Sequence, residues 1–534
     1  MSYLHFDKAQ MTNLQESLPK EILRTNRSGA YSCSTIVDCN TRKYHGLLVV
    51  PVKELDGGNH VLLSSLDETV IQHGAQFNLG LHKYSGNVFS PNGHKYIRSC
   101  EWEKLPTTIY RVGGVILKKE KVFQHFENRI LIRYTLLDAH SATTLRLRPF
   151  LAFRSVEDCT HENAGASRKY DLIDNGIKTR MYSGYPELMM QLNKKNEFVF
   201  DPAWYRGIEY QKEQELGYEY REDLYVPGYF EFDIKKGESV VFAAGLSELK
   251  TNQMKKIFDH EYDVHVPRTN FQSCLVNAAH QFHYERDGET YIIAGYPWFK
   301  CRARDMFVSL PGLTLAIDEV EYYEKAMKTA VKALNDFMDG TDTNIMMCEM
   351  EKPDVLLWAV WCIQQYSRLV STEAAMEKYG KLVGKIIDFI RQGKHPNLLL
   401  HDNGLLFTNG RDHAVTWMNS EVNGVPVVPR SGYVVEINAL WYDALLFYAE
   451  MLMAKGRHAE AGDYTRLAEL TGKSFKETFL NEHGYLLDYV DEGYTSWEVR
   501  PNMLIASSLE YSPLTTPDRK KIFDICTKEL LTPK

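Results

Sequence analysis

Hydrophobic and polar residues alternate with a period of two from about residue 20 to about residue 245. Apolar or alternating runs of strand length occur at 43–52, 60–71, 127–139 and 143–153. Strands show this period because successive side chains point to opposite faces of a sheet. The turns between the runs are rich in Gly, Asn, Asp and Pro, as hairpin connections are. Many strands without long helices between them predict an antiparallel β-sandwich, which we place at residues 1–250.

The period changes to that of a helix after roughly residue 250. Long amphipathic segments lie at 319–339, 372–392, 435–455 and 460–480. The turns before some of these segments carry unusual clusters of polar and aromatic residues. Paired long helices with elaborate loops at one end predict an (α/α)6-type helical toroid whose site is formed by the loops. We place a helical linker at 251–270 and the toroid at 271–534.

The helical part is short for a closed toroid. Twelve helices with their loops need roughly 300–360 residues, which is more than 271–534 provides. We therefore expect either fewer helices or a domain that is truncated at its C-terminus, so that the natural protein would continue beyond Lys534.

Composition and charge narrow the class of protein. Hydrophobic residues make up 44% and charged residues 25% of the chain, as in an ordinary globular protein. The formal net charge of −8 without a polybasic cluster makes nucleic acid and anionic membranes poor partners. We find no apolar run of membrane-spanning length and no signal peptide. Nine irregularly spaced cysteines fit reduced thiols, so we expect a cytoplasmic protein.

The first cluster of candidate chemistry lies at 294–316, where Trp298 precedes Arg304 and Asp305 at the start of a predicted helix. An Arg–Asp pair beside an aromatic ring suits a sugar: the ions hydrogen-bond hydroxyl groups and the ring packs on the CH face. The same residues are also typical of a helix cap with an internal salt bridge, and both interpretations stay open.

Two further clusters precede predicted helices. In the second, Asp354 follows Pro353 and comes four residues before Trp358, a pattern that a helix cap alone would explain. The third cluster contains Trp417, Asn419, Glu421, Arg430, Glu436, Asn438 and Trp441. Of these, Glu436 and Asn438 would also fit core groups bonded to neighbouring backbone. Three such clusters at successive helix starts predict a carbohydrate cleft, and we find no metal-binding motif.

Longer motifs resemble a known family. The stretch 40–48, Asn-Thr-Arg-Lys-Tyr-His-Gly-Leu-Leu, resembles the N-terminal domain of prokaryotic or archaeal-type glycogen debranching enzymes. The C-terminal half resembles the amylo-α-1,6-glucosidase domain of that family at 294–299, 304–305, 416–418, 429–430, 436–442 and 500–502. The resemblance implies a β-sandwich followed by a glucoamylase-like toroid. It also implies inverting hydrolysis of the α-1,6-linked glucose at a branch point of glycogen or another branched α-glucan.

The sequence departs from the family pattern at the catalytic positions. The family has an Asp, the expected general acid, where this chain has Asn419, and an amide cannot donate a proton in the reaction. The segment of the family that carries the general base is not reached. We therefore name three substitute catalytic candidates: Asp354, Glu436 and Glu421. The residues predicted to bind substrate are Trp298, Arg304, Asp305, Trp358, Trp417, Asn419, Arg430, Asn438 and Trp441.

The departures leave three functions open. The first is α-1,6-glucosidase activity by an inverting two-carboxylate mechanism, which needs no metal or organic cofactor because two carboxyls and water suffice. The second is an α-glucan-binding protein that has lost catalysis, which Asn419 favours. The third is a related toroidal exo-α-glucosidase with another linkage preference.

Overall fold

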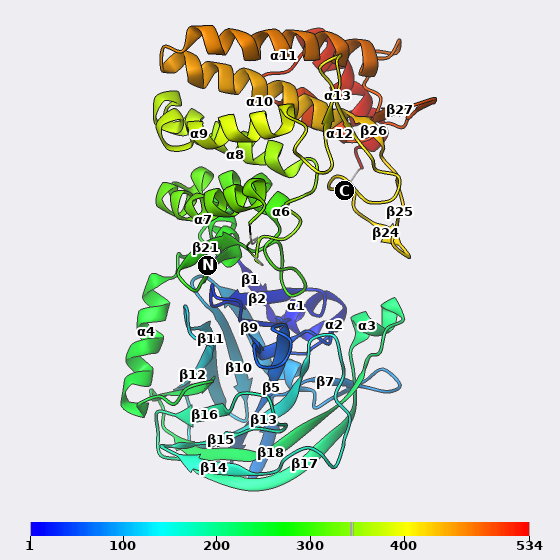
Figure 1. The fold of residues 1–534 in the computed structure, drawn as a ribbon. Coiled ribbons are helices and arrows are strands. Elements are labelled where there is room, and N and C mark those ends of the chain that lie inside the picture. Colours follow the sequence, from blue (N-terminus) through cyan, green and yellow to red (C-terminus); the bar gives the residue numbers. More distant parts are fainter. Residues whose placement is uncertain (1, 342–343, 345, 533–534) are drawn as a thin grey trace. The chain divides into compact units, whose positions relative to one another are not determined.

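The computed structural model describes residues 2–341, 344 and 346–532. The chain divides into two compact units, Met1–Arg286 and Asp287–Lys534. Strands make up most of the first unit and helices most of the second (Figure 1). The predicted change from a β region to a helical region is therefore confirmed.

The first unit contains two large antiparallel sheets. The nine-stranded sheet has the order β1 (His5–Asp7), β9 (Ile97–Trp102), β10 (Pro106–Val112), β11 (Val115–Phe123), β12 (Arg129–Asp138), β19 (Ser239–Gly245), β16 (Leu188–Leu192), β15 (Gly176–Thr179) and β14 (Tyr170–Ile173). The ten-stranded sheet has the order β2 (Glu21–Thr25), β3 (Tyr31–Thr35), β4 (Gly46–Pro51), β5 (Asn59–Gln72), β13 (Thr143–Ser155), β18 (Arg221–Ile234), β17 (Glu197–Glu209), β7 (His82–Tyr84) and β8 (Val88–Ser90), with β6 (Ala75–Asn78) paired to β5.

One hydrophobic core joins the two sheets. Leu63 and Leu147 of the ten-stranded sheet and Leu117, Ile132 and Phe242 of the nine-stranded sheet belong to the same buried cluster. Over residues 143–148 of β13 and 115–118 of β11 buried residues alternate with partly exposed ones, as the period of two requires when one face of a sheet is covered. Short helices connect the strands: α1 (Lys8–Thr12), α2 (Leu14–Ser17), η1 (Gly93–Tyr96) and α3 (Gln211–Leu216).

The first unit extends further along the chain than the expected β domain. It includes η2 (Thr251–Gln253), α4 (Met254–Val264), α5 (Phe271–Phe282) and β20 (His283–Arg286). Met254 and Phe258 of α4 form a buried cluster with Val122 and Leu131 of the nine-stranded sheet. The apolar face of α4 thus packs on the sheet, so the segment expected as a linker belongs to the first unit.

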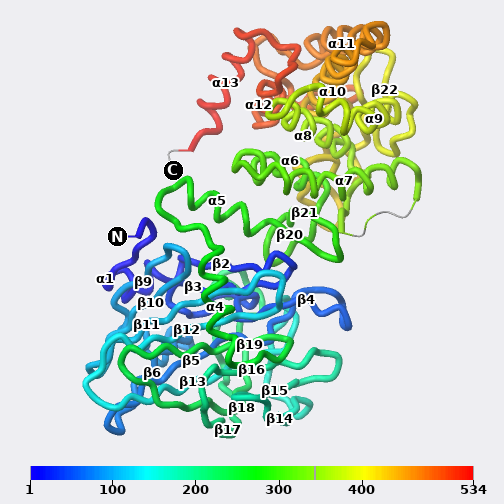
Figure 2. Tube along the Cα trace, turned by 90° about the vertical axis from the view of Figure 1, so that its left-hand side faces the viewer, coloured from blue at the N-terminus to red at the C-terminus, as the bar shows by residue number. Residues whose placement is uncertain are grey.

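The second unit begins with β21 (Glu289–Ile292) and continues with helices. These are α6 (Ala303–Leu313), η3 (Leu315–Ile317), α7 (Val320–Asp339), α8 (Val355–Leu369), α9 (Thr372–Arg391), α10 (Val435–Ala454), α11 (His458–Phe479), α12 (Asn502–Ser508) and α13 (Thr516–Leu530). Contacts link α6 to α8, α8 to α10 and α10 to α12, while α9, α11 and α13 lie against these helices. Figure 2 shows α8, α9, α10 and α11 packed together. Closure into a toroid stays a prediction. In the described part of the chain, no helix is both long enough and apolar enough to cross a membrane.

A small sheet in the second unit brings distant segments together. Its strands are β22 (Leu399–Leu400), β23 (Leu406–Thr408), β26 (Gly432–Val434), β27 (Tyr489–Asp491) and β28 (Tyr494–Thr495), and a separate hairpin joins β24 (Glu421–Val422) to β25 (Val425–Pro426). Tyr433 of β26 pairs with Val490 of β27. The pairing places the segment before α10 beside a segment more than fifty residues later, which neither period nor motif predicted.

We expect Gly432→Ala to destabilise the second unit. Gly432 has φ +93, and a Cβ at this position would lie 2.2 Å from the backbone oxygen of Val490. The backbone strain and the overlap of the new Cβ with Val490 should together lower the free energy of unfolding by about 3 kcal/mol. Unfolding in urea measures this difference. Gly493→Ala is the matched control, because Gly493 also has a positive φ of 73 but a Cβ there meets nothing within 4 Å. Equal losses of unfolding free energy in Gly432→Ala and Gly493→Ala would contradict this explanation.

Candidate functional site

A buried ion pair joins the starts of α6 and α8. Arg304 lies in the first turn of α6, and Asp354 immediately precedes α8. Arg304 Nε donates to Asp354 Oδ2 over 2.7 Å, and Nη2 donates to Oδ1 over 2.9 Å. The indole Nε1 of Trp358 also donates to Oδ2, at 3.2 Å. All three side chains are buried. The bidentate pair therefore fixes two helix starts relative to each other.

Asp305 lies beside this pair but keeps its side chain at the surface. The protein around Asp305 raises the pKa of its carboxyl by desolvation, and Glu349 adds to the rise, whereas Arg304 and Arg302 oppose it. Glu349 itself adopts φ +65 and buries Oε2 without a hydrogen-bond partner among the described residues. A second carboxyl is thus held close to Asp305, which sequence reasoning missed because Glu349 lies in a segment without periodicity.

A larger buried network surrounds Arg430. Its guanidinium bonds both oxygens of Glu436, with Nη2 to Oε2 at 2.6 Å, and both carboxylate oxygens of Asp488, with Nε to Oδ2 at 3.0 Å and Nη2 to Oδ1 at 2.8 Å. Arg500 Nη1 donates to Asp488 Oδ2 over 2.7 Å, and Asn502 Nδ2 donates to Oδ1 over 2.7 Å. Two guanidinium groups thus balance two carboxylates, which makes the burial of these charges tolerable.

Glu436 is not a free carboxylate, because it is buried and bonded to Arg430. Burial raises the pKa of Glu436, and the charge of Asp488 adds to the rise, while Arg430 opposes it. Both oxygens of Glu436 are bonded to Arg430, and the residue is only 1% exposed. A proton on this carboxyl would have no direct path to a ligand at the surface.

The network anchors an exposed aromatic ring. The indole Nε1 of Trp417 donates to Asn502 Oδ1 over 2.8 Å, and Trp417 is 46% exposed. The hydrogen bond fixes the Nε1 edge of the indole, and almost half of the residue stays exposed to solvent. In the cluster before α6, Trp298 is 55% exposed. Exposed rings of this kind provide an apolar surface on which a sugar ring can pack.

The loop that carries Trp417 touches the start of α8. Lys352 Nζ donates to the backbone oxygen of Ala414 over 3.0 Å, and the backbone N of Ala414 donates to Glu421 Oε1 over 3.3 Å. Figure 1 shows this loop in yellow with β24 and β25. The starts of α6 and α8 and the loop before α10 therefore form one continuous region of the second unit.

Comparisons with known proteins assign this chain to a family. The family model for the N-terminal part of glycogen debranching enzymes matches residues 20–241, and the amylo-alpha-1,6-glucosidase model matches residues 272–534. The chain belongs to the glycogen debranching enzyme family. Family membership places it among the glycoside hydrolases of the debranching type.

One solved structure supports the fold assignment. A bacterial glucoamylase in complex with acarbose matches with a TM-score of 0.51 and 11% sequence identity, over 96% of this chain and 78% of that chain. At this identity the likeness concerns the fold alone. A search of curated proteins found no match.

The site residues predicted from the sequence divide into two groups. Exposed in the structure are Trp298, Asp305, Trp417, Asn419 and Glu421. Buried are Arg304, Asp354, Trp358, Arg430, Glu436, Asn438 and Trp441. The first group lies at the surface of the second unit, and the second group lies in its interior. Contact of any of them with a substrate stays a prediction.

Two predicted cleft residues are core residues in this structure. Asn438 Oδ1 accepts from Leu406 N over 2.7 Å, and Nδ2 donates to the backbone oxygens of Leu406 and Val434. Trp441 and Asn438 are both 0% exposed. The amide of Asn438 therefore joins α10 to β23. This agrees with the alternative interpretation, in which Asn438 is a core residue bonded to neighbouring backbone. We leave both residues out of the proposed ligand-binding surface.

Sequence analysis did not assign a role in the site to Asp488 or to Asn502, although Asn502 lies in the motif 500–502 that carries the resemblance. Asp488 is the second carboxylate that is bonded to Arg430. Asn502 accepts a hydrogen bond from the indole of Trp417. The sequence around Asp488, Gly-Tyr-Leu-Leu-Asp-Tyr-Val, places an acid within an apolar run. A charged residue in such a run is either paired or functional, so this signal could have identified it.

A group of potential metal ligands in the first unit does not fit a metal ion. Ligand atoms of Glu21, Cys33 and His45 lie within 4.8 Å of one another. However, His45 Nδ1 accepts from Thr41 N, so the proton of the neutral ring is on Nε2, which faces Glu21. Burial raises the pKa of the Cys33 thiol to about 12. Arg42 already balances Glu21, with Nε to Oε1 at 2.6 Å. The group is held by the ion pair of Arg42 with Glu21 and by the hydrogen bond from Thr41 N to His45, and we propose no metal site here.

We expect Arg430→Met to destabilise the second unit by about 3–5 kcal/mol, because Glu436 and Asp488 would remain buried with too little opposite charge. The measurement is the free energy of unfolding in urea. Arg411→Met is the control: Arg411 pairs with Asp491 at 2.8 Å, but its side chain is 63% exposed. This variant should lose less than about 1 kcal/mol. Equal losses would show that the network contributes no more than a surface pair.

Asp443 of α10 should make stability depend on pH. Burial raises the pKa of its carboxyl from 3.8 to about 6, while Oδ1 accepts from Gln364 Nε2 and Tyr511 N. A raised pKa means that the folded state holds the proton more tightly, so this contribution is complete below pH 3.8 and is lost as pH rises through about 6.

The matched variant is Asp443→Asn, which keeps the acceptor oxygen and removes the titration. Relative to this variant, the wild type should lose stability on the order of 3 kcal/mol between pH 4 and pH 7. Thermal or urea unfolding across this range measures the difference. A constant difference between the two proteins would contradict the assignment to Asp443.

Proposed function

We propose that the protein removes the α-1,6-linked glucose at the branch points of a branched α-glucan. The amylo-alpha-1,6-glucosidase family model over residues 272–534 carries this proposal. The surface formed by Trp298, Asp305, Trp417, Asn419 and Glu421 supports it, because aromatic faces and polar groups of this kind recognise sugars.

In this proposal the exposed groups bind and the buried groups position them. The faces of Trp298 and Trp417 pack against the CH face of the sugar, and Asp305 accepts hydrogen bonds from its hydroxyl groups. The backbone of Asp305 is held in place because the preceding residue, Arg304, is bonded to Asp354 through its guanidinium group. Trp417 is held through Asn502. Groups that are fixed before the ligand arrives lose little conformational entropy on binding.

We assign to Glu421 the role of acid, which donates its proton to the leaving oxygen, and to Asp305, the other exposed carboxyl of this surface, the role of base, which takes a proton from the attacking water. Inverting hydrolysis needs an acid for the leaving oxygen and a base for the water, with the two carboxyls about 6.5–9.5 Å apart. Of the three catalytic candidates, Asp354 and Glu436 are buried against arginines, whereas Glu421 is exposed. Glu421 uses Oε1 to accept from the backbone of Ala414, which would orient the carboxyl.

Asn419 favours a second candidate function, binding of the glucan without hydrolysis. Its side chain is exposed in the same loop as Glu421, and an amide offers hydrogen bonds but no transferable proton. The protein would then hold a branched glucan through the same rings and polar groups. A related exo-α-glucosidase with another linkage preference would also use this surface.

Glucose release from a branched limit dextrin distinguishes these functions. We expect the wild-type chain to release glucose, and Glu421→Gln to lower kcat by about 10²–10⁴-fold without loss of dextrin binding. Glu482→Gln, a change at another exposed glutamate, should leave the rate unchanged. If hydrolysis inverts the configuration, the first product seen by NMR is β-glucose.

Other outcomes select the alternatives. Dextrin binding without glucose release by the wild type would favour the binding function, and release gained by Asn419→Asp would then identify the missing acid. Faster release from α-1,4-linked or trehalose-type substrates would favour another linkage preference. Neither binding nor release would reject all three functions.

A further inference from the structure

An open pocket lies in the first unit where four segments of the chain meet. Its walls come from α2 and the two residues after it, from the motif 40–48, from the hairpin of β7 and β8, and from α3. Figure 1 shows α2, β7 and α3 at the same side of this unit. The volume of the pocket is about 380 Å³, within the range of about 300–1,000 Å³ that small-molecule sites have. The pocket therefore has room for a ligand much larger than water.

The motif 40–48 provides a fixed wall of this pocket. Thr41 lines the pocket, and its backbone oxygen accepts from the backbone N of Lys212 in α3 over 2.9 Å. The next residue, Arg42, donates through Nε to Glu21 Oε1 of β2 over 2.6 Å. These bonds hold the motif against α3 and β2 before a ligand arrives, which lowers the entropy cost of binding.

Three carboxamide side chains line the pocket: Gln15, Asn87 and Gln211. Gln15 and Asn87 are exposed, and their side chains form no hydrogen bond with any described residue. Gln211 Nε2 donates to Glu215 Oε1 over 3.0 Å, which leaves the amide oxygen of Gln211 available as an acceptor. A carboxamide has both donor and acceptor atoms, and so has a sugar hydroxyl group. These side chains can therefore bind hydroxyl groups.

The pocket has no uncompensated charge. Among the described residues that line it, Lys212 alone is charged, and its Nζ pairs with Glu215 Oε2 over 2.7 Å. An anionic ligand would have to compete with this carboxylate for the ammonium group. A cationic ligand would find no carboxylate among the described lining residues. The charges thus favour a neutral ligand.

Apolar side chains form the rest of the wall: Leu14, Leu18, Pro19 and Phe89. Leu14 and Phe89 pack against the core of the unit and remain partly exposed. A sugar ring has an apolar CH face and a rim of hydroxyl groups, so a site that binds it combines apolar or aromatic groups with a few polar ones. The pocket has both kinds of wall.

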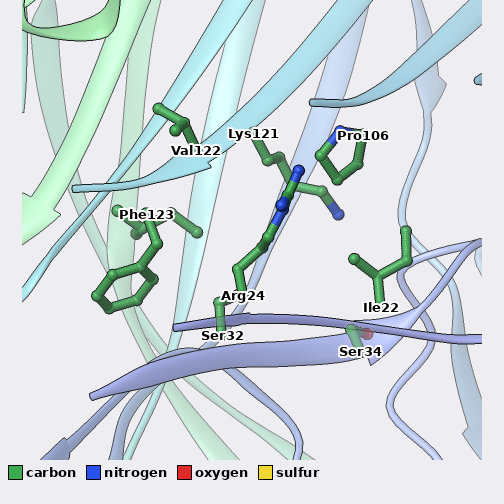
Figure 3. Close-up of a pocket in the computed structure, with 9 residues that line it drawn as sticks. Ile22, Arg24, Ser32, Ser34, Pro106, Lys121, Val122 and Phe123 are labelled. Atoms are coloured by element: carbon green, nitrogen blue, oxygen red, sulfur yellow. The ribbon is translucent and has the colours of Figure 1, made fainter. Parts of the chain in front are cut away.

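The cavities inside the same unit are too small for such a ligand. Figure 3 shows one of them, between the two sheets, with Arg24 and Lys121 in its wall. Its volume is about 10 Å³, and so is that of the cavity lined by Asp38 and Lys119. A single water molecule needs about 10–15 Å³. The buried charges of the core are therefore closed to a sugar, in contrast to the open pocket beside α2 and α3.

We propose that this open pocket is a second carbohydrate-binding site, which holds a neutral α-1,4-linked segment of the glucan on the first unit. The choice of an α-glucan rests on the proposed function, whereas the size, the amides and the absence of uncompensated charge in the described wall point to a neutral oligosaccharide. The pocket binds the sugar and takes no part in bond cleavage. A polysaccharide presents many such segments, so this site would keep the protein on the polymer between rounds of hydrolysis.

Calorimetric titration of the full chain with maltotriose tests the proposal, because this linear trisaccharide is α-1,4-linked and contains no α-1,6 bond. We expect the wild type to bind maltotriose and Gln15→Leu to raise the Kd about 5–10-fold, the loss of one hydrogen-bonding group without loss of side-chain size. Gln253→Leu is the matched control at an exposed glutamine of η2 and should keep the wild-type Kd. Absence of binding by the wild type, or an unchanged Kd in Gln15→Leu, would overturn the proposal.

A comparison with the second unit separates this site from the proposed hydrolytic surface. A Kd that rises in Trp417→Ala but not in Gln15→Leu would place the sugar on the second unit, which would overturn this proposal and support the other. Maltotriose binding that depends on Gln15, in a protein that releases no glucose from a limit dextrin, would reject the proposed hydrolysis and support this site.

A direct measurement covers the case in which the variants do not fold. Crystals of the wild-type protein are soaked in maltotriose. We expect density for a hexose ring beside Phe89, within hydrogen-bond distance of the amides of Gln15 and Gln211. A pocket without sugar density at saturating maltotriose would overturn the proposal.

Discussion

The bonds of Arg430 to Glu436 and Asp488 hold together the part of the molecule on which the candidate site depends. They join the loop before α10, the first turn of α10 and the segment that enters β27. Asp488 lies 58 residues after Arg430 in the sequence, so the network fixes the segment that enters β27 to the start of α10. Because the charges are buried and balanced, removing any one of these side chains leaves a charge in the interior without full compensation. The network can therefore exist only when all three segments are in place.

The exposed groups of the site derive their positions from such buried pairs. Asp305 follows Arg304, whose guanidinium is fixed by Asp354, and the indole of Trp417 is fixed through Asn502 to Asp488. Ionic groups thus form a rigid layer beneath a surface of rings and polar side chains. This arrangement explains why residues that look like sugar-binding groups in the sequence divide into buried and exposed sets.

The sequence predicted the architecture better than the site. The periods of two and of a helix located strands such as β5, β12 and β13 and helices such as α9 and α10, because burial of one face determines both patterns. Spacing alone could not show that Asn438 bonds the backbone of Leu406, or that Asp488 is the partner of Arg430. Such contacts depend on how β26 and β27 pair, which is a long-range property. The division at Arg286 was also not predictable from the period, because α4 is an amphipathic helix that packs on a sheet.

A crystal structure of the protein with isomaltose, an α-1,6-linked glucose disaccharide, tests the central claim most directly. The account predicts that a sugar ring packs on Trp298 or Trp417 and hydrogen-bonds Asp305, while Arg430 keeps its bonds to Glu436 and Asp488. A sugar bonded directly to Arg430, Glu436 or Trp441, or bound away from these loops, would contradict the division into a buried ionic layer and an exposed binding surface.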